Sequence, residues 1–215
     1  MKAMIVKIPE EHVPLTIIRE VVSILQKGGV IGYPTETVYG LGGDAYNSRA
    51  VSRINRIKGR KKEKPLLVLV PGKEDVFPLV SNIPDYADIL MNHFWPGGLT
   101  LVFQASDRLP GFITGGTGKV GIRVSSDQFC CQLMEVFQHP LVSTSANLKG
   151  ELPARKVDEV VNYFGDELDM ILDGGARMMG MPSTVVDVSE SEPKFIRIGA
   201  VKENEIWSVI GGENG

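Results

Sequence analysis

Hydroxyl groups and a carboxylate follow directly after a short apolar run near the start of the chain. The run Val30–Tyr33 is typical of a buried strand, and the segment PTETVYGLG at 34–42 follows it. In open α/β sheets, ligands bind beyond the carboxyl ends of the strands. We therefore expect Thr35, Glu36 and Thr37 to lie in a loop whose hydroxyls hydrogen-bond a ligand.

A basic cluster lies between Arg53 and Lys64, where seven basic residues accompany one acid in a chain whose formal net charge is −3. Lys58 and Arg60 offer a point charge and a planar fork, which together suit a polyphosphate. The cluster directly precedes the apolar run Leu66–Val70, so we expect it at the edge of the sheet that holds the Thr35 loop. For the charges alone, an exposed helix end that neutralises the helix dipole is an equal alternative.

Two further polar segments lie next to predicted strands. Residues 143–147, with the sequence STSAN, place three hydroxyls and an amide after a short strand, and Ser183 and Thr184 lead into another. These side chains suit hydrogen bonding to sugar, phosphate or amino-acid groups. They are also ordinary turn and cap residues, so neither segment indicates a site by itself.

Arg123 stands in a predicted strand whose other members are apolar or small, Val120–Val124. A cation in such a place needs a partner, which is either a structural acid or the carboxylate of a ligand. Arg197, within the apolar segment 195–199, poses the same choice.

Several other kinds of site find no support in the sequence. Gly115–Lys119 lacks the first glycine and the last hydroxyl of a Walker phosphate loop, and it is predicted to be a glycine turn. Cys130 and Cys131 are neighbours in an apolar helical pattern, which indicates core thiols. The histidines have no metal-ligand spacing, and no nucleophile elbow of the Gly-x-Ser-x-Gly type is present.

The composition is that of an ordinary globular protein. The 215 residues, 43% hydrophobic and 23% charged, are enough for one large domain. The acidic balance argues against a surface that binds nucleic acid throughout. No apolar run approaches the roughly 20 residues that span a bilayer, and the N-terminus has no signal pattern, so we expect a cytoplasmic protein without a membrane segment.

Hydrophobic periodicity predicts the elements that must position these residues. We expect helices over Val13–Leu25, Ala50–Ile57, Ala87–Phe94, Gln128–Phe137 and Val157–Phe164. We expect strands over Val30–Tyr33, Leu66–Val70, Thr100–Phe103, Val120–Val124, Leu141–Ser143 and Met170–Leu172, and a hairpin of Thr184–Val188 with Lys194–Ile198. The chain is thus predicted to open with a helix and to form an α/β fold, a twisted mixed sheet of parallel and antiparallel strands with flanking helices.

Taken together, six segments resemble the YrdC/TsaC family in order and spacing. They are PTETVYGLG (34–42), Lys58-x-Arg60 followed by Pro65-Leu66, WPGGLT (95–100), VGIRV (120–124), SAN (145–147) and STVVD (183–187). The resemblance runs from about Leu15 to Gly199. It implies the single-domain form of the family, one YrdC-like domain over residues 1–215 with its core at about 15–199.

The resemblance also implies an activity, because the family's enzymes are threonylcarbamoyl-AMP synthases, which are nucleotidyltransferases. They make threonylcarbamoyl-AMP and pyrophosphate from L-threonine, bicarbonate or carbon dioxide, and ATP, for the threonylcarbamoyladenosine modification of tRNA. We accordingly expect Mg²⁺ on the phosphates of ATP, ligated mainly by substrate and water. The tRNA threonylcarbamoyl transferase complex is the functional partner that the resemblance implies.

Residue by residue, the resemblance assigns roles at both ends of the expected site. Residues implied to hold the nucleotide and to be needed for activity are Lys58, Arg60, Ser145 and Asn147. Secondary nucleotide contacts are Lys64, Lys119 and Arg197. Residues implied to bind threonine are Thr35, Thr37, Arg123, Ser143 and Ser183, with Arg123 as the physical candidate for the carboxylate.

Two alternatives stay open. The first is a module of the same fold that binds double-stranded RNA or tRNA through the basic cluster and has no synthase activity. The second is a carbamoyl-transfer role like that of the related domain in hydrogenase-maturation proteins, although such domains sit within much longer chains.

Overall fold

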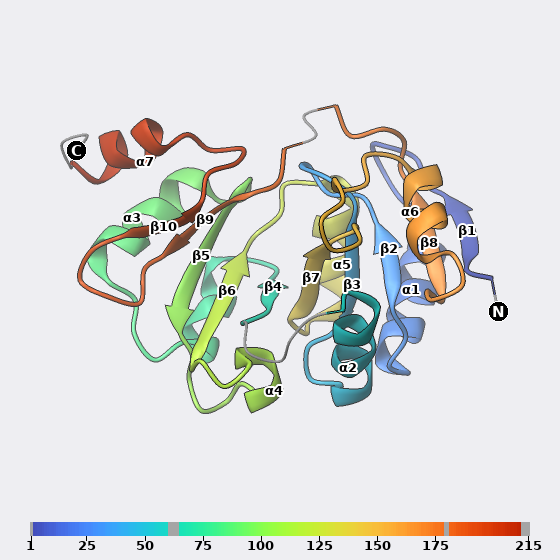
Figure 1. Ribbon diagram of the computed structural model, residues 1–215, viewed down its shortest axis with the longest axis horizontal. Helices are drawn as coiled ribbons and strands as arrows, with labels where there is room; N and C mark the ends of the chain where they lie inside the picture. Colours follow the sequence, from blue (N-terminus) through green and yellow to red (C-terminus); the bar gives the residue numbers. More distant parts are fainter. Residues whose placement is uncertain (1, 60–64, 179–180, 212–215) are drawn as a thin grey trace.

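The computed structural model describes residues 2–59, 65–178 and 181–211 of the chain. Within these ranges the strands form one sheet, in the order β1-β8-β2-β3-β7-β4-β6-β5-β9-β10. The strands are β1 (Met4–Lys7), β2 (Ile31–Tyr33), β3 (Gly40–Asp44), β4 (Leu67–Leu69), β5 (Leu99–Gln104), β6 (Lys119–Arg123), β7 (Leu141–Ser145), β8 (Met170–Asp173), β9 (Thr184–Asp187) and β10 (Lys194–Arg197). The twisted sheet spans the molecule in Figure 1.

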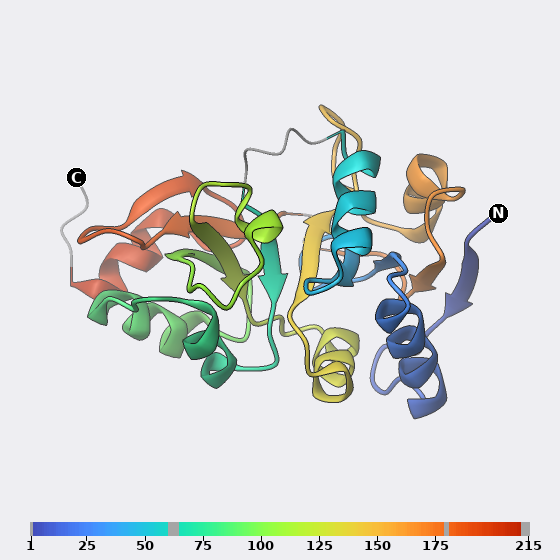
Figure 2. The same ribbon diagram turned by 90° about the horizontal axis from the view of Figure 1, so that it is seen from below.

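Helices cover both faces of this sheet. They are α1 (Leu15–Gln26), α2 (Ser48–Ile57), α3 (Asp85–Phe94), α4 (Gly111–Thr114), α5 (Gln128–Phe137), α6 (Val157–Phe164) and α7 (Glu203–Ile210), with a 3-10 helix, η1, at Lys73–Leu79. Figure 2 shows α1, α3 and α5 on one side of the sheet and α2 and α6 on the other. The buried face of each helix is the one that carries its apolar residues. In α1, for example, Val21 and Leu25 are four residues apart and both are fully buried.

The sheet is mixed, as the sequence predicted. The pairs β1–β8, β2–β8, β4–β6 and β5–β9 are parallel. The pairs β2–β3, β3–β7, β4–β7, β5–β6 and β9–β10 are antiparallel. The register places Ser143 of β7 opposite Leu67 of β4 and Gly42 of β3, so the centre of the sheet brings together segments far apart in the sequence.

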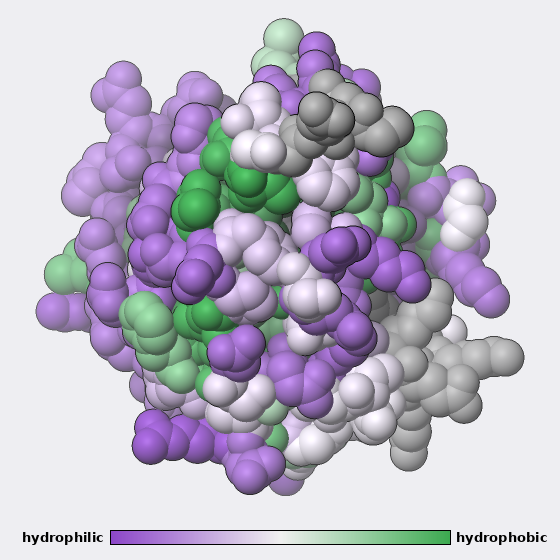
Figure 3. Space-filling view, turned by 90° about the vertical axis from the view of Figure 1, so that its left-hand side faces the viewer, coloured by the Kyte–Doolittle hydropathy of each residue, from purple (hydrophilic) through white to green (hydrophobic). Residues whose placement is uncertain are grey.

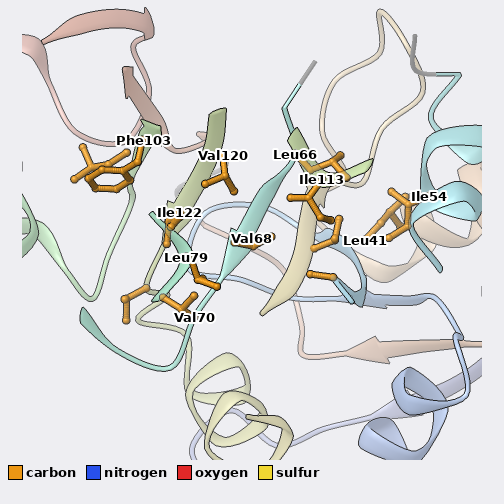
Figure 4. Packing of buried hydrophobic residues seen from close by; sticks show 14 of the residues in the cluster. Leu41, Ile54, Leu66, Val68, Val70, Leu79, Phe103, Ile113, Val120 and Ile122 are labelled. Carbon is orange, nitrogen blue, oxygen red and sulfur yellow. The ribbon is translucent and has the colours of Figure 1, made fainter. Parts of the chain in front are cut away.

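Close packing holds the centre of the sheet in place. Figure 4 shows Val68 of β4 beside Val120 and Ile122 of β6, with Leu41 of β3 facing Ile54 of α2. These side chains are buried completely or nearly so. The end of the molecule seen in Figure 3 is mostly hydrophilic, with small apolar areas between the polar side chains.

All the predicted helices and strands are present, with ends that shift by a few residues, but two expectations were wrong and one central strand was not predicted. The chain opens with β1 and not with a helix, because residues 4–7 pair with β8 at the edge of the sheet. The segment Gly40–Asp44, for which no strand was predicted, is the buried strand β3. Ser143–Ser145 lie inside β7, which continues beyond the predicted strand, and only Ala146 and Asn147 follow it.

Candidate functional site

A cavity of about 370 Å³ opens at the centre of the sheet. Its walls come from β3, β4, β5, β6, β7, β9 and β10 and from the segments that follow β2 and that precede β4 and β9. The polar residues among those that line it are Thr35, Thr37, Tyr39, Thr100, Arg123, Ser143, Thr144, Ser145, Ser183 and Arg197. The hydroxyl-bearing segments and the two arginines that the sequence singled out therefore share one cavity.

One end of the site is built around Lys58, which directly follows α2. Asn47 caps the start of that helix by accepting from the backbone N–H groups of Arg49 and Ala50. The Lys58 ammonium donates to the carbonyl of Ser145 at 2.8 Å and to Oδ1 of Asn147 at 2.8 Å. Ser145 Oγ donates to the same Asn147 oxygen at 2.7 Å. Three of the four residues that the resemblance assigned to the nucleotide thus form one hydrogen-bonded group.

The Thr35 hydroxyl organises the loop after β2. Its Oγ1 donates to the carbonyl of Val38 at 2.7 Å and accepts from the backbone N–H groups of Thr37 and Val38. This local turn stops the chain from continuing β2 and presents Thr37 to the cavity. The Oγ1 atoms of Thr35 and Thr37 are 2.9 Å apart, and both residues are almost completely buried.

Two serines place hydroxyls on other walls of the cavity. The buried hydroxyl of Tyr33 donates to Ser143 Oγ at 2.7 Å. Burial raises the pKa of Tyr33 far above its usual value, so this hydroxyl keeps its proton and Ser143 is left to donate its own. Ser183 Oγ accepts from the hydroxyl of Thr100 at 2.9 Å.

Arg123 ends β6 and is only 4% exposed. Its Nη1 forms an ion pair with Glu36 Oε1 at 3.2 Å and donates to Thr37 Oγ1 at 3.4 Å. Its Nε has no hydrogen-bond acceptor among the residues that the structure describes. The cation therefore has a structural acid as its partner, and it keeps one N–H group that has no acceptor among the described residues and that a ligand could use.

Arg197 approaches the same end of the cavity from β10. Its guanidinium donates to the carbonyl of Ser183 at 2.8 Å and 3.1 Å and to the Ser183 hydroxyl at 3.2 Å. Burial lowers the pKa of Arg197, and the nearby positive charge of Arg123 lowers it further. Arg123 and Arg197 thus line the same cavity, which favours an anionic ligand there.

Not all of the predicted nucleotide contacts line the cavity: Lys58 and Asn147 do not, but both are hydrogen-bonded to Ser145, which does. Arg60 and Lys64 lie outside the described residues. Lys119 begins β6 and does not line the cavity; its ammonium pairs with Asp187 of β9 at 2.8 Å.

The described part of the basic cluster does not form a free cationic face. Arg53 pairs with Asp169 at 2.5 Å, and Arg56 pairs with Glu167 at 3.0 Å. Lys58 turns toward β7. These contacts join α2 to the segment between α6 and β8. Some of the basic residues in the cluster therefore have a structural role.

Sequence reasoning missed a second buried ion pair, which supports the Thr35 loop. Arg177 Nη1 contacts Asp127 Oδ2 at 2.9 Å, donates to the carbonyl of Thr35 at 3.4 Å, and its guanidinium lies over the ring of Tyr39. Asp127 also caps α5 through its other oxygen. An aspartate just before an amphipathic run is a visible cap signal, but its distant partner is not.

Comparison with known proteins agrees with this geometry. The family model Sua5_yciO_yrdC, which carries the description "Telomere recombination", matches residues 23–199. The chain belongs to this family. One solved structure that resembles this chain is that of Pyrococcus abyssi Sua5 complexed with L-threonine. It superposes with a TM-score of 0.93 at 35% identity, and the match covers 97% of this chain and 61% of that one.

Curated relatives of this Sua5/YciO/YrdC chain carry the name threonylcarbamoyl-AMP synthase. The protein from Pyrococcus abyssi is 37% identical over 90% of this chain, and the protein from Bacillus subtilis is 34% identical over 90%. The chain spans 57% and 56% of the length of those two relatives. The protein from Coxiella burnetii is 37% identical over 81% of this chain and 94% of its own length.

The described residues include neither a cluster of metal-ligating side chains nor a membrane-spanning helix. They contain no group of three or more histidine, cysteine, aspartate or glutamate side chains that could hold a metal ion. None of their helices is both long and apolar enough to cross a membrane.

Proposed function

We propose that this chain is a threonylcarbamoyl-AMP synthase that forms threonylcarbamoyl-AMP and pyrophosphate from L-threonine, bicarbonate or carbon dioxide, and ATP. The observation that carries the proposal is one cavity lined by hydroxyl groups, by Arg123 and Arg197, and by Ser145, which is hydrogen-bonded to Lys58 and Asn147. The names of the relatives and the L-threonine complex of Pyrococcus abyssi Sua5 support the same reading.

The threonine end consists of Thr35, Thr37, Arg123, Ser143 and Ser183 in this proposal. All five line the cavity. Arg123 binds the substrate carboxylate, because a guanidinium matches that group in charge and shape. The hydroxyls hydrogen-bond the amine and the side-chain oxygen. Thr35 acts partly through Thr37, since its own hydroxyl is engaged in the turn.

The reaction needs two anions held together more than it needs a covalent nucleophile. L-Threonine and bicarbonate give a carbamate on the threonine nitrogen with loss of water. A carbamate oxygen then attacks the α-phosphorus of ATP, the bond from that phosphorus to the bridging oxygen breaks, and pyrophosphate leaves. Positive charge and donors fixed in a largely dry cavity stabilise the charge that shifts to pyrophosphate.

The nucleotide end consists of Lys58, Ser145 and Asn147, together with Arg60 and Lys64. Lys58 neutralises phosphate charge at a position that Asn147 and the Ser145 carbonyl fix. Lys119 and Arg197 complete the assignment as secondary contacts. Their present partners are Asp187 and Ser183, so ATP would have to compete with or extend those contacts.

Magnesium enters the proposal with ATP. The described residues supply no cluster of acids, so the donor set fits an ion that phosphate oxygens and water ligate. We further propose that the product is passed, in the cytoplasm, to the transferase complex that modifies tRNA. Direct RNA binding as the main role has weaker support, because Arg53 and Arg56 are already paired with acids.

The proposal predicts pyrophosphate release from ATP that requires both L-threonine and bicarbonate. Lys58→Ala and Arg60→Ala should lose this activity while the far-ultraviolet circular dichroism and the melting temperature show that the fold persists. Arg56→Ala is the matched control, since Arg56 lies on the same basic stretch but faces Glu167. Pyrophosphate release that ignores L-threonine, or that survives in Lys58→Ala, would refute the proposal.

A further inference from the structure

Glu36 lies between two threonines that line the cavity but does not line it itself. Its side chain is 17% exposed and that of Arg123 is 5% exposed, so the ion pair between them is largely removed from water. Glu36 therefore contacts Arg123 from outside the cavity, where a ligand would not touch it.

The carboxylate of Glu36 joins two points on the segment that leaves β6. One oxygen pairs with Arg123 Nη1 at 3.2 Å, and the other accepts a short hydrogen bond from the hydroxyl of Ser125. The backbone of this segment is fixed as well, because the Val70 N–H donates to the Arg123 carbonyl and the Gly97 N–H donates to the Val124 carbonyl. The Ser125 hydrogen bond anchors the carboxylate, so Glu36 offers Arg123 a fixed negative charge, which Oε1 supplies as an ion pair without a hydrogen bond among the described residues.

Arg123 needs such a restraint for two reasons. An arginine side chain has many rotamers, and a site that fixes it in advance avoids that ordering cost when a ligand binds. Arg197 also lies close enough for the two positive charges to repel. Because Glu36 forms an ion pair with Arg123, it offsets part of this repulsion where both guanidinium groups line the cavity.

We propose that Glu36 is a positioning residue that holds the Arg123 guanidinium in the orientation that binds the carboxylate of the amino-acid substrate. The inference rests on the proposed function, and it adds to that function a residue that acts through another. It also gives Ser125 a part, since its hydroxyl holds the second oxygen of Glu36.

The test is steady-state pyrophosphate release by the full chain, with Glu36→Gln, Arg123→Met and the double variant. Glu36→Gln should raise the KM for L-threonine by about tenfold, because Arg123 loses the charge that orients it, and leave kcat and the KM for ATP unchanged. In the Arg123→Met background, Glu36→Gln should have no further effect on kcat/KM for L-threonine. Glu36→Asp should recover part of the loss.

Two further variants keep the test decisive. If Glu36→Gln does not fold, Ser125→Ala carries the same expectation with a smaller rise in the KM for L-threonine, because it frees one oxygen of Glu36 and leaves its charge. Asp169→Asn is the control: it breaks a carboxylate–arginine pair that does not line the cavity, so it should lower the melting temperature without changing the KM for L-threonine.

The outcomes separate the inference from the function on which it rests. Equal rises in the KM values for L-threonine and ATP, or an undiminished effect of Glu36→Gln in the Arg123→Met background, would overturn the role of Glu36 alone. Failure of the unaltered protein to release pyrophosphate in response to L-threonine would overturn the proposed function.

Discussion

At the scale of residues, the cavity depends on side chains that are fixed before any ligand arrives. Ser143 accepts from Tyr33, Ser183 accepts from Thr100, and Asn147 accepts from Lys58. Each contact fixes one hydrogen-bonding direction and leaves the remaining capacity of the group for a substrate. A site built in this way loses little side-chain entropy when it binds.

Tyr33→Phe tests this arrangement with the removal of one oxygen. The variant should lower the free energy of unfolding by about 1 kcal/mol, because a buried hydrogen bond is lost while the ring stays in place. It should also weaken L-threonine binding slightly, since Ser143 loses the donor that orients it. Urea denaturation and calorimetry measure the two effects; an unchanged unfolding free energy would contradict the importance of this contact.

The residue scale also marks a limit of sequence reasoning. The apolar neighbours of Arg123 correctly indicated that the cation needs a partner, and the structure supplies Glu36. The pairing itself could not be predicted, because 87 residues separate the two and strand order decides which segments meet. The same holds for Arg177 and Asp127.

At the scale of elements, the strands that carry the site are unusual in composition. β3 reads GLGGD, which has low strand propensity, and no strand was predicted there. Its glycines are needed for space: a Cβ on Gly42 would come within 2.8 Å of the Tyr33 ring, and one on Gly43 within 3.0 Å of Ile54. Packing against a tyrosine and a helix, which no local pattern shows, overrides the propensity.

The longer, regular elements were predictable because their signals are local. The helix at Gln128–Phe137 was predicted with both ends correct, since Asp127 caps it and the apolar spacing is regular. The hairpin of β9 and β10 follows from two strand patterns across a polar turn. The local patterns do not show which of these elements lie beside the Thr35 loop. Only the family resemblance and the fold show that.

Asp187→Asn tests how the elements on one side of the sheet are joined. Lys119 of β6 reaches across β5 to Asp187 of β9. Burial alone would raise the pKa of Asp187, but the hydrogen bonds from Lys119 and Ser189 outweigh it, and the pKa is lowered. A carboxylate whose pKa is lowered in the folded state stabilises the fold at pH values above its pKa in the unfolded chain, which is near 4. It loses this contribution as the pH falls through its pKa in the folded protein.

The variant should therefore melt about 2–4 °C below the unaltered protein at pH 7, the shift for about 1 kcal/mol in a chain of this size. The difference should shrink below about pH 4. Melting curves from pH 3 to pH 7 check this prediction. A difference that stays constant over that range would show that the charge of Asp187 is not its cause.

At the scale of the whole molecule, strands from both halves of one sheet bring arginine and hydroxyl side chains to the same cavity. The loop after β2 and strands β3 and β7 supply one part, and β4, β6, β9 and β10 supply the other. Figure 1 shows β3, β7, β4 and β6 side by side at the centre of the sheet, with β9 and β10 at one edge. Such an arrangement favours a small, charged ligand over a long polyanion.

Salt dependence separates these two kinds of ligand. Binding of double-stranded RNA through several phosphates should weaken by orders of magnitude between about 50 and 200 mM salt. Binding of L-threonine in a buried cavity should change by less than about threefold over the same range. Tight RNA binding at about 50 mM salt that weakens steeply in this way, with no detectable binding of L-threonine, would favour the RNA-binding alternative.

Calorimetry with L-threonine and a nonhydrolysable ATP analogue tests the central claim most directly, because it separates the two ends of the cavity. Arg123→Ala should weaken L-threonine by roughly 1.5–3 kcal/mol and leave the analogue almost unaffected, and Lys58→Ala should do the reverse. Equal loss of both ligands in either variant, or binding of L-threonine that ignores Arg123, would contradict the division of the cavity into an amino-acid end and a nucleotide end.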